Sequence, residues 1–472
     1  MTTIDILPDE VLLAIFDSWV DEDVLEKKEV EAWQLLVHVC RRWRSVVFGS
    51  PRRLNLRLVC GAKTPASDTL DVWPSFPLVI RHSDCGQGHN LDNIITVLGR
   101  SDRVCQIDLS GLGPPSTENV LAVMQQTFPE LTDLRLEGMP TAVPDSFLGG
   151  SAPRLRKLWL GRIMSPFPGL PKLLLSASHL VELQLCDIQY PKSFSLKAMV
   201  TALSTLTSLR FLSLKARFVY SEFHPNRESR RLPPTRSLLP VLGTLRFAGV
   251  SKYFDDLVVH IDAPRLNNLD IILFKQNALD TPKFIQFTNC IPMLEALKKA
   301  HVAFQVDGAG VKLSSQSSSG HGELKVKIPG RTFKLNEQLL SLQRVFTLCL
   351  PPLSMSEDLY IYENTDPQPD WPDDVENTLW LELLHPFPAV KNLYLSKEIA
   401  SCIAPALQEL IGGTATEVLP ILQNIFLELW PVPGGIEQFI AARQLSGRPI
   451  AVSTIPLWER DLMRSWVMEF NY

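Results

Sequence analysis

Side chains that commonly bind metals lie close together early in the chain. His82, Cys85 and His89 have ligand-like spacing, and Asp84 lies between them. A structural zinc site usually takes four ligands from histidine, cysteine and carboxylate side chains. A fourth ligand has no obvious local source, so we favour an ordinary polar loop over a zinc site. Stoichiometric zinc in the purified protein would revive the hypothesis of an enzyme.

Other residues with possible chemistry lack the neighbours that this chemistry needs. Gly86-Gln87-Gly88 is not followed by the third glycine of a dinucleotide fingerprint, and the sequence has no Gly-Lys-Ser/Thr phosphate loop. Gly149-Gly150-Ser151 lacks the context of a nucleophile elbow, and no set of Ser, His and Asp stands out. We therefore expect a protein that is not an enzyme and that uses no cofactor and no metal.

The composition limits the classes of function further. A chain of 472 residues exceeds what one hydrophobic core usually serves, so it should contain several domains or a repeat array. The apolar content of 45% is ordinary for a soluble protein. A net charge of −5 argues against a nucleic-acid partner, because nucleic-acid binders usually present a basic face to phosphates.

The cysteines and the N-terminus predict the compartment. Cysteines 40, 60, 85, 105, 186, 290, 349 and 402 are scattered singly, which is typical of reduced thiols in an intracellular protein. The first residues lack the basic and apolar runs of a secretory signal, and no apolar stretch approaches the roughly 20 residues that span a bilayer. We expect a cytoplasmic or nuclear protein without a membrane partner.

A repeat dominates the sequence after residue 101. The pattern Leu-x-x-Leu-x-Leu, with conservative replacements, starts at residues 104, 131, 155, 180, 209, 242, 266 and 390. The starts from 131 to 209 are 24, 25 and 29 residues apart, which is the spacing of leucine-rich repeats. Each repeat should form a strand followed by a helix or irregular return, with the leucines in one continuous core. The predicted fold class is α/β, a degenerate leucine-rich-repeat solenoid with parallel strands on its concave face.

The repeats depart from the ideal motif at one position. Where Asn or Cys is usual after the last leucine, this chain has Met139, Ile163, Ile188, Arg217, Val250 and Phe274. The polar ladder that ties the turns of a regular solenoid is therefore missing. We expect apolar packing to hold these turns.

Each repeat also supplies one residue to a predicted recognition surface. Side chains alternate along a strand, so the residue between the last two apolar positions points away from the core. These candidate substrate-binding residues are Arg135, Trp159, Gln184, Ser213, Arg246, Asp270 and Tyr394. Arginine and aromatic side chains often dominate protein recognition. A solvated sheet face without a partner remains the alternative for any single residue.

The first fifty residues contain two amphipathic helical patterns. Residues 5 to 20 place Leu12, Ile15, Phe16 and Trp19 on one face, with Pro8 in the first turn. A second stripe runs from Trp33 to Val47, and Gly49-Ser50-Pro51 ends it. Two short helices with wide apolar faces need the rest of the chain or a partner to cover them.

These patterns resemble an F-box. The resemblance rests on Leu7-Pro8-Asp9-Glu10-Val11-Leu12, Ile15-Phe16 and Val39-Cys40-Arg41-Arg42-Trp43-Arg44, and it covers residues 5 to about 55. It implies a small helical module that binds the Skp adaptor of a cullin–RING ubiquitin ligase. The implied adaptor-binding residues are Leu7, Pro8, Leu12, Ile15, Leu36, Val39, Cys40 and Trp43. The acidic stretch around residues 21 to 31 looks like an insertion into the family pattern.

The predicted organisation has three parts. Residues 1–55 form the F-box-like module, residues 56–100 a connecting region, and residues 101–472 the solenoid with a C-terminal cap. We expect long loops at residues 218–240, 314–322 and 351–378. A helix at 436–445, a strand at 449–453 and an amphipathic segment at 458–470 should follow, and the last of these should cap the stack. The leading hypothesis is a non-catalytic substrate receptor that binds the Skp adaptor, and through it a cullin, and presents an unidentified protein for ubiquitin transfer. The alternative is a repeat scaffold whose N-terminal helices fold onto its own repeats.

Overall fold

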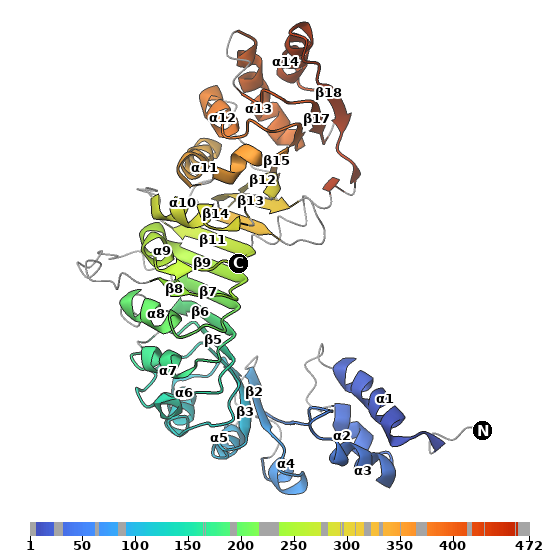
Figure 1. The fold of residues 1–472 in the computed structure, drawn as a ribbon, viewed down its shortest axis with the longest axis vertical. Coiled ribbons are helices and arrows are strands. Elements are labelled where there is room, and N and C mark those ends of the chain that lie inside the picture. The colour runs from blue at the N-terminus through green and yellow to red at the C-terminus, as the bar shows by residue number, and fades with distance from the viewer. Residues whose placement is uncertain are drawn as a thin grey trace. The chain divides into compact units, whose positions relative to one another are not determined.

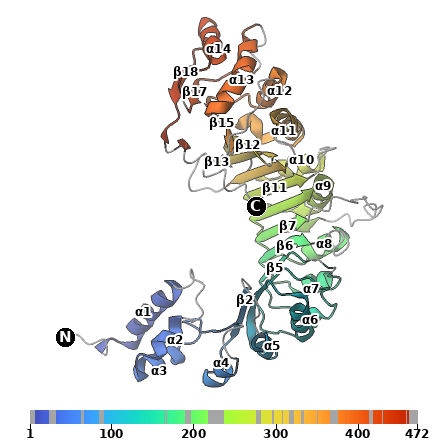
Figure 2. The same ribbon diagram turned by 180° about the vertical axis from the view of Figure 1, so that it is seen from behind.

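The computed structural model describes most of the chain (Figures 1 and 2). The described residues are 6–22, 32–61, 66–83, 91–163, 165, 167–188, 196–216, 236–274, 282–292, 294, 297–306, 308–315, 322–329, 334–349, 351–364, 375–412, 418–428, 430–457 and 459–460. They divide into two compact units, residues 1–209 and residues 210–472.

The first unit begins with a helical module of three helices: α1 (Asp9–Glu22), α2 (Ala32–Val37) and α3 (Arg41–Gly49). Its buried apolar side chains are Leu12, Phe16, Trp33, Leu36, Val37, Val46 and Val47. The second helical stripe was predicted as one helix, and this is wrong at residues 38–40. There the chain leaves the helix, and Cys40 adopts an extended conformation (φ −157°, ψ 171°) as the N-cap of α3.

The rest of the first unit alternates strands and helices. Its strands are β1 (Leu58–Cys60), β2 (Leu78–Ser83), β3 (Val104–Ser110), β4 (Asp133–Glu137), β5 (Lys157–Gly161) and β6 (Glu182–Ile188). They pair in sequence order, and every pair is parallel. The helices are α4 (Ala66–Val72), α5 (Asp92–Leu98), α6 (Pro114–Val123), α7 (Leu170–Ser176) and α8 (Leu196–Leu203), with a short 3₁₀ helix, η3, at Phe147–Gly150. The helices lie on one face of the sheet (Figures 1 and 2).

The second unit continues the same architecture with a longer set of strands. They are β7 (Phe211–Ala216), β9 (Thr244–Val250), β11 (Asn268–Phe274), β12 (Leu297–Gln305), β13 (Gly308–Ser315), β14 (Glu323–Pro329), β15 (Asp358–Asn364), β16 (Asn392–Leu395), β17 (Asn424–Leu427) and β18 (Ala451–Thr454). A separate two-stranded sheet contains β8 (Ser237–Leu238) and β10 (Ile261–Asp262).

The strand order of this unit includes one departure from the repeat. The order is β7-β9-β11-β14-β13-β12-β15-β16-β17-β18, and β13 runs antiparallel to both β12 and β14. The other pairs in this order are parallel. A three-stranded meander is thus inserted into a stack of strand–helix repeats, and the repeat pattern of the sequence did not predict it.

The helices of the second unit lie on one face of its sheet, as in the first unit (Figures 1 and 2). They are α9 (Ser251–Val258), α10 (Pro282–Asn289), α11 (Leu335–Cys349), α12 (Asn377–Leu384), α13 (Lys397–Glu409) and α14 (Gly434–Leu445), with short 3₁₀ helices η6 (Pro351–Met355) and η7 (Leu410–Gly412). We call the opposite face of each sheet, which carries the side chains between the repeat leucines, the strand face.

The repeat prediction is confirmed. Each predicted repeat contains a strand, and its leucines or their replacements are buried between strands and helices; Leu134, Leu158 and Leu183 lie in register on neighbouring strands. Met139 and Ile163, which replace the usual polar turn residue, are fully buried, so apolar packing does hold these turns. The sheet also starts before residue 101, because β1 and β2 lie in the stretch expected to be a connecting region.

Several predictions lie wholly or partly outside the described residues. They concern Cys85 and His89, most of the loop at 218–240, residues 316–321 and 365–374 of the other two loops, and nearly all of residues 458–470. Within the described part of the chain, no helix is long and apolar enough to cross a membrane.

Candidate interaction surfaces

The first candidate surface lies on helix α1, which carries two apolar stripes. Leu12 and Phe16 point into the core of the module. Val11, Ile15 and Trp19 follow at i, i+4 and i+8 on another side of the helix, where Ile15 is 46% exposed and Trp19 is 52% exposed. An amphipathic helix that folds a small module needs the first stripe and leaves the second to solvent or to a partner. Further exposed apolar side chains in the same module are Ile6, Leu35 and Val39.

The predicted adaptor-binding residues fall into three groups of exposure. Pro8, Ile15 and Val39 are exposed, while Leu7, Cys40 and Trp43 are half-buried. Leu12 and Leu36 are buried inside the module. Leu12 and Leu36 therefore contribute to the folded module, and only the exposed and half-buried residues are accessible to a partner.

The residues of the Val-Cys-Arg-Arg-Trp motif hold the module together. The Cys40 sulfur accepts a hydrogen bond from the backbone N–H of Trp43 at 3.5 Å, which caps α3. The Arg42 guanidinium reaches the start of α1, where it pairs with the Asp9 carboxylate at 2.7 Å and donates to the Leu7 carbonyl. The Trp43 ring packs against Phe16, with 4.8 Å between centroids. This part of the motif fixes α1 relative to α3.

The module also packs on the residues that follow it. The Trp33 indole N–H donates to the Arg57 carbonyl at 3.0 Å, and its ring packs edge-on against Trp73 and Phe76 at 5.2 and 5.6 Å. Trp33 thus belongs to the core, as expected if the N-terminal helices fold onto the chain itself, whereas Trp19 is exposed.

The second candidate surface is the strand face of the first unit. Asp108, Arg135, Trp159 and Gln184 lie opposite one another on β3, β4, β5 and β6. The predicted residues of this unit therefore form one row, and Asp108 extends it. Strand alternation was the signal that found the row.

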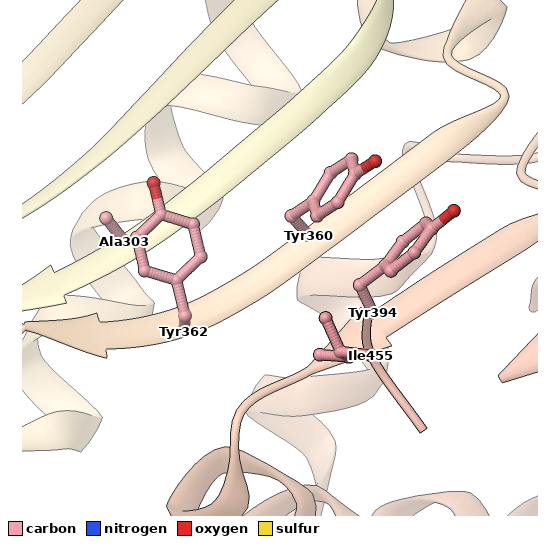
Figure 3. Close-up of a cluster of buried hydrophobic side chains, with 5 residues drawn as sticks. All are labelled: Ala303, Tyr360, Tyr362, Tyr394 and Ile455. Atoms are coloured by element: carbon pink, nitrogen blue, oxygen red, sulfur yellow. The ribbon is translucent and has the colours of Figure 1, made fainter. Parts of the chain in front are cut away.

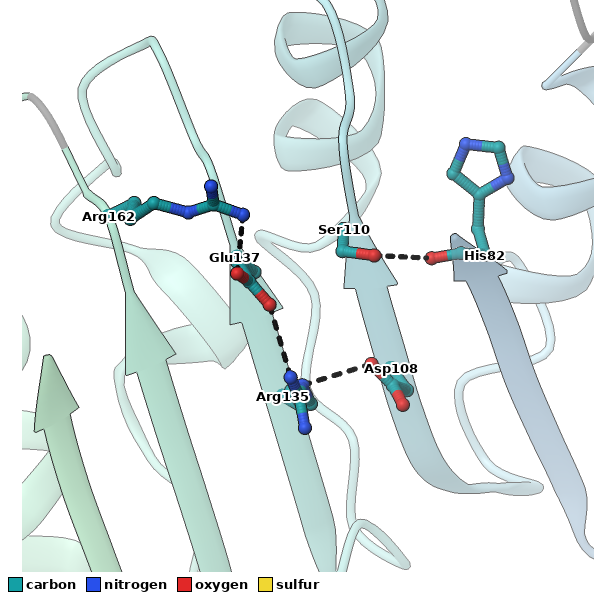
Figure 4. A network of polar contacts seen from close by, with 6 residues as sticks. All are labelled: His82, Asp108, Ser110, Arg135, Glu137 and Arg162. Carbon is teal, nitrogen blue, oxygen red and sulfur yellow. Dashed lines mark hydrogen bonds and ion pairs between the residues drawn. The ribbon is translucent and has the colours of Figure 1, made fainter. Parts of the chain in front are cut away.

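Arg135 is held in place from several sides (Figure 4). Its guanidinium donates to Glu137 at 3.1 Å, lies 3.6 Å from the Asp108 carboxylate and stacks on the Trp159 ring at 4.2 Å from the centroid. Glu137 also accepts from Arg162. The Trp159 ring in turn lies over Gly161, where a Cβ would overlap it. Such mutual support orders an arginine and a tryptophan in advance of binding.

The third candidate surface is the strand face of the second unit. Its register aligns Ser213, Arg246, Asp270, Lys325, Lys312, His301, Tyr360, Tyr394, Phe426 and Ser453. The predicted residues of this unit all lie in this row. The row residues that come from the meander and from β15, β17 and β18 were not predicted from the sequence. Leu422, Ile425 and Leu427 carry the repeat spacing in β17, so Phe426 could have been found.

Four rings of this row form an aromatic ladder: His301, Tyr360, Tyr394 and Phe426. Successive centroids are 4.2, 4.1 and 4.4 Å apart, and the rings are within 11° of parallel. Next to them, Asn392 donates to Asp358 at 2.6 Å and Asn424 donates to Asn392 at 2.7 Å, which forms a polar ladder on the same strands.

The predicted solvent exposure of Tyr394 is wrong, because its side chain is only 8% exposed. The neighbouring rings cover its faces, and Ile455 joins the same buried cluster with Ala303, Tyr360 and Tyr362 (Figure 3). Burial, with the nearby carboxylates of Glu459 and Asp358, raises the pKa of Tyr394 to about 12. Burial also lowers the pKa of His301 well below its ordinary value, so the ladder consists of neutral rings at pH 7.

Two carboxylates next to this surface, Glu357 and Glu363, have pKa values that are shifted in opposite directions. Hydrogen bonds from Lys298 at 2.6 Å and Lys391 at 2.9 Å lower the pKa of Glu357 to about 2. Burial raises the pKa of Glu363 to about 7, although Ser396 donates a hydrogen bond to it. Neither is part of a metal site: the described residues contain no group of three or more potential metal ligands.

Comparisons with known proteins add little to this geometry. No protein-family model matches the sequence, and no curated protein matches it. Among solved structures, the leucine-rich repeat-containing protein LegL7 from Legionella pneumophila is similar to 73% of this chain and 91% of its own, with 14% identity and a TM-score of 0.27. The fold assignment rests on the strand order and leucine register of the chain itself.

Proposed function

We propose that this repeat scaffold is a non-catalytic substrate receptor of a Skp–cullin–F-box ubiquitin ligase. Its N-terminal helical module would bind the Skp adaptor, and its strand faces would bind a protein substrate. The observation that carries the proposal is the second apolar stripe of α1, Val11, Ile15 and Trp19, which the core of the module leaves exposed. Exposed apolar side chains that follow a helical period favour a protein partner.

The F-box resemblance supplies the identity of that partner. Val39 lies directly before the α3 cap and is 58% exposed, and Pro8 is exposed directly before α1. Burial of this apolar surface would drive binding at about 25 cal/mol per Å² before the costs of association are subtracted. Cys40, Arg42 and Trp43 would act indirectly, by holding α1 and α3 in position.

The test is co-elution of the purified chain with the Skp adaptor. We expect the wild-type chain to bind, and a variant with Ile15→Asp and Val39→Asp to lose binding by at least tenfold, because both substitutions place a charge in the proposed contact. Leu445→Asp is the matched control, since Leu445 is 90% exposed but lies in α14. The free energies of unfolding of all three proteins should agree to within about 0.5 kcal/mol, because surface substitutions usually change stability by no more than this.

A wild-type chain that fails to co-elute would contradict the ligase connection. The fold would then support the plainer alternative, a repeat scaffold whose strand faces bind proteins without a ubiquitin ligase. The packing of Trp33 on Trp73 and Phe76 favours this alternative, because it shows part of the module covered by the chain itself.

A further inference from the structure

Two described residues that follow the last strand, Ile455 and Glu459, contact the aromatic ladder of the second unit. Ile455 donates its backbone N–H to Leu427 at 2.9 Å, and its side chain packs into the cluster with Tyr360 and Tyr394 (Figure 3). The Tyr360 hydroxyl donates to the Glu459 carboxylate at 2.6 Å, across 99 residues of sequence. This segment therefore contacts the ladder with one apolar and one acidic side chain.

A third contact fixes the end of the same segment. The Arg460 guanidinium donates to the Glu428 carbonyl at 2.7 Å and lies 3.5 Å from the Glu428 carboxylate. The chain forms a turn here and does not continue as a strand, because the backbone N–H groups of Glu459 and Arg460 both donate to the Pro456 carbonyl. Past Ile455, the described segment is thus held on the strand face largely by side chains and not by a continuous strand ladder.

The chemistry of the ladder explains why an acidic side chain is needed. The edges of the stacked rings accept apolar groups, but the covered hydroxyl of Tyr360 favours a hydrogen-bond acceptor. A carboxylate is the strongest acceptor that a side chain can offer. Any segment that covers the ladder without an acceptor would remove this charge-assisted hydrogen bond from a buried hydroxyl.

We propose that the aromatic ladder is a docking surface for a protein segment that presents an apolar side chain and a carboxylate, and that Ile455 and Glu459 occupy it in cis. This inference deepens the proposed function, because it names the substrate class for one strand face. Side-chain contacts of this kind can exchange, whereas a continued strand ladder would have to be unpaired first. A tethered occupant competes at an effective concentration in the millimolar range, so a free segment binds well only when the cis contact is weakened.

The experiment uses the full chain and a labelled peptide with the sequence of residues 455–472. Glu459→Gln in the chain weakens the cis occupant and leaves the ladder intact. Loss of a charge-assisted hydrogen bond commonly changes a binding constant by about tenfold. We expect the E459Q chain to bind the peptide about tenfold more tightly than the wild type, and to exchange the amide hydrogens of residues 455–460 faster.

Two further variants separate docking from simple loosening. Glu437→Gln is the matched control, because Glu437 is exposed on α14, and it should behave as the wild type. Adding Tyr360→Phe to E459Q should lower peptide affinity about tenfold while keeping the stacked ring. Equal affinities in all four proteins, or no measurable binding by any, would overturn the proposal and leave the segment as a permanent cap.

Adaptor co-elution, measured on the same variants, keeps this result distinct from the proposed ligase connection. Glu459 and Tyr360 lie in the second unit, so their substitution should leave adaptor binding unchanged. Loss of peptide docking with adaptor binding retained would reject the ladder as a docking surface and not the receptor.

Discussion

Glu357 shows how a single side chain joins neighbouring repeats. It accepts from Lys298, the second residue of β12, and from Lys391, directly before β16. Its own residue precedes β15, which lies between those two strands. The carboxylate therefore links the N-terminal ends of three neighbouring strands, β12, β15 and β16. Glu357 lies in the stretch that was predicted as a long loop, residues 351–378, and a local pattern does not indicate the two lysines, which are 59 and 34 residues away.

We predict that Glu357→Gln makes stability less sensitive to acid. The pKa of Glu357 is about 2 in the folded chain against an ordinary value of 4.5. A lowered carboxyl pKa contributes stability that is present above 4.5 and is lost as the pH falls from about 4.5 towards 2. Since both lysines are more than a third exposed, we expect the substitution to cost about 1 kcal/mol at pH 7 and nothing near pH 2.

Urea unfolding of the wild type and the variant at a series of pH values measures this difference. Glu382→Gln is a suitable control, because Glu382 is exposed on α12. Glu363 contributes with the opposite sign in both proteins: its raised pKa of about 7 favours the folded state at low pH, and this contribution is lost as the pH rises through 7. A gap between E357Q and wild type that is constant from pH 7 to pH 2 would contradict the assignment.

Among the elements, strand β5 depends on the absence of one side chain. Trp159 and Gly161 are two residues apart and lie on the same face of the strand. The ring covers the glycine, and the guanidinium of Arg135 on β4 stacks on the same ring. Alternation along the strand predicts that Trp159 and Gly161 both lie on the strand face. It does not predict that the indole ring lies over Gly161 of the same strand.

We predict that Gly161→Ala moves the Trp159 ring and separates it from Arg135, because the new Cβ would overlap the indole. The expected cost is about 1–3 kcal/mol, which is typical of overpacking. Tryptophan emission should change on Gly161→Ala in the wild-type background and stay constant in a Trp159→Phe background. Gly434→Ala is the control, since a Cβ there meets nothing within 4 Å. The same emission change in both backgrounds would show that another tryptophan responds.

The helices and strands differ in how well the sequence predicts them. Repeat strands such as β4, β5 and β6 follow from leucine spacing because burial on one face imposes a fixed pattern. The break between α2 and α3 was missed, because Val39 and Cys40 continue the apolar stripe although the chain turns there. The Cys40 sulfur caps a new helix at this point, although the apolar periodicity continues through it. The meander β12-β13-β14 was missed for another reason: β12 and β13 are buried along most of their length, and their sequences lack the repeat spacing.

Over the length of the chain, the candidate surfaces were partly predictable. The rows of strand-face residues follow from alternation within repeats, and the register confirms them from Arg135 to Gln184 and from Ser213 to Asp270. The cover of the ladder was not predictable, because Tyr360 and Glu459 meet across 99 residues and neither lies in a recognised motif. Contacts between distant segments are decided by packing, which a local pattern does not encode.

A repeat architecture also predicts how far along the chain a core substitution lowers local stability. Each repeat contacts mainly its neighbours, so stability is close to a sum of local terms and nearest-neighbour interfaces. Leu158→Ala removes a buried side chain from the core behind β5 and should cost about 2–5 kcal/mol. Amide hydrogen exchange should then accelerate in β4, β5 and β6 and stay at the wild-type rate in β16 and β17. Leu393→Ala in β16 should give the reverse pattern, because Leu393 is equally buried. Uniform acceleration over both units in either variant would show instead that the chain unfolds as one cooperative body.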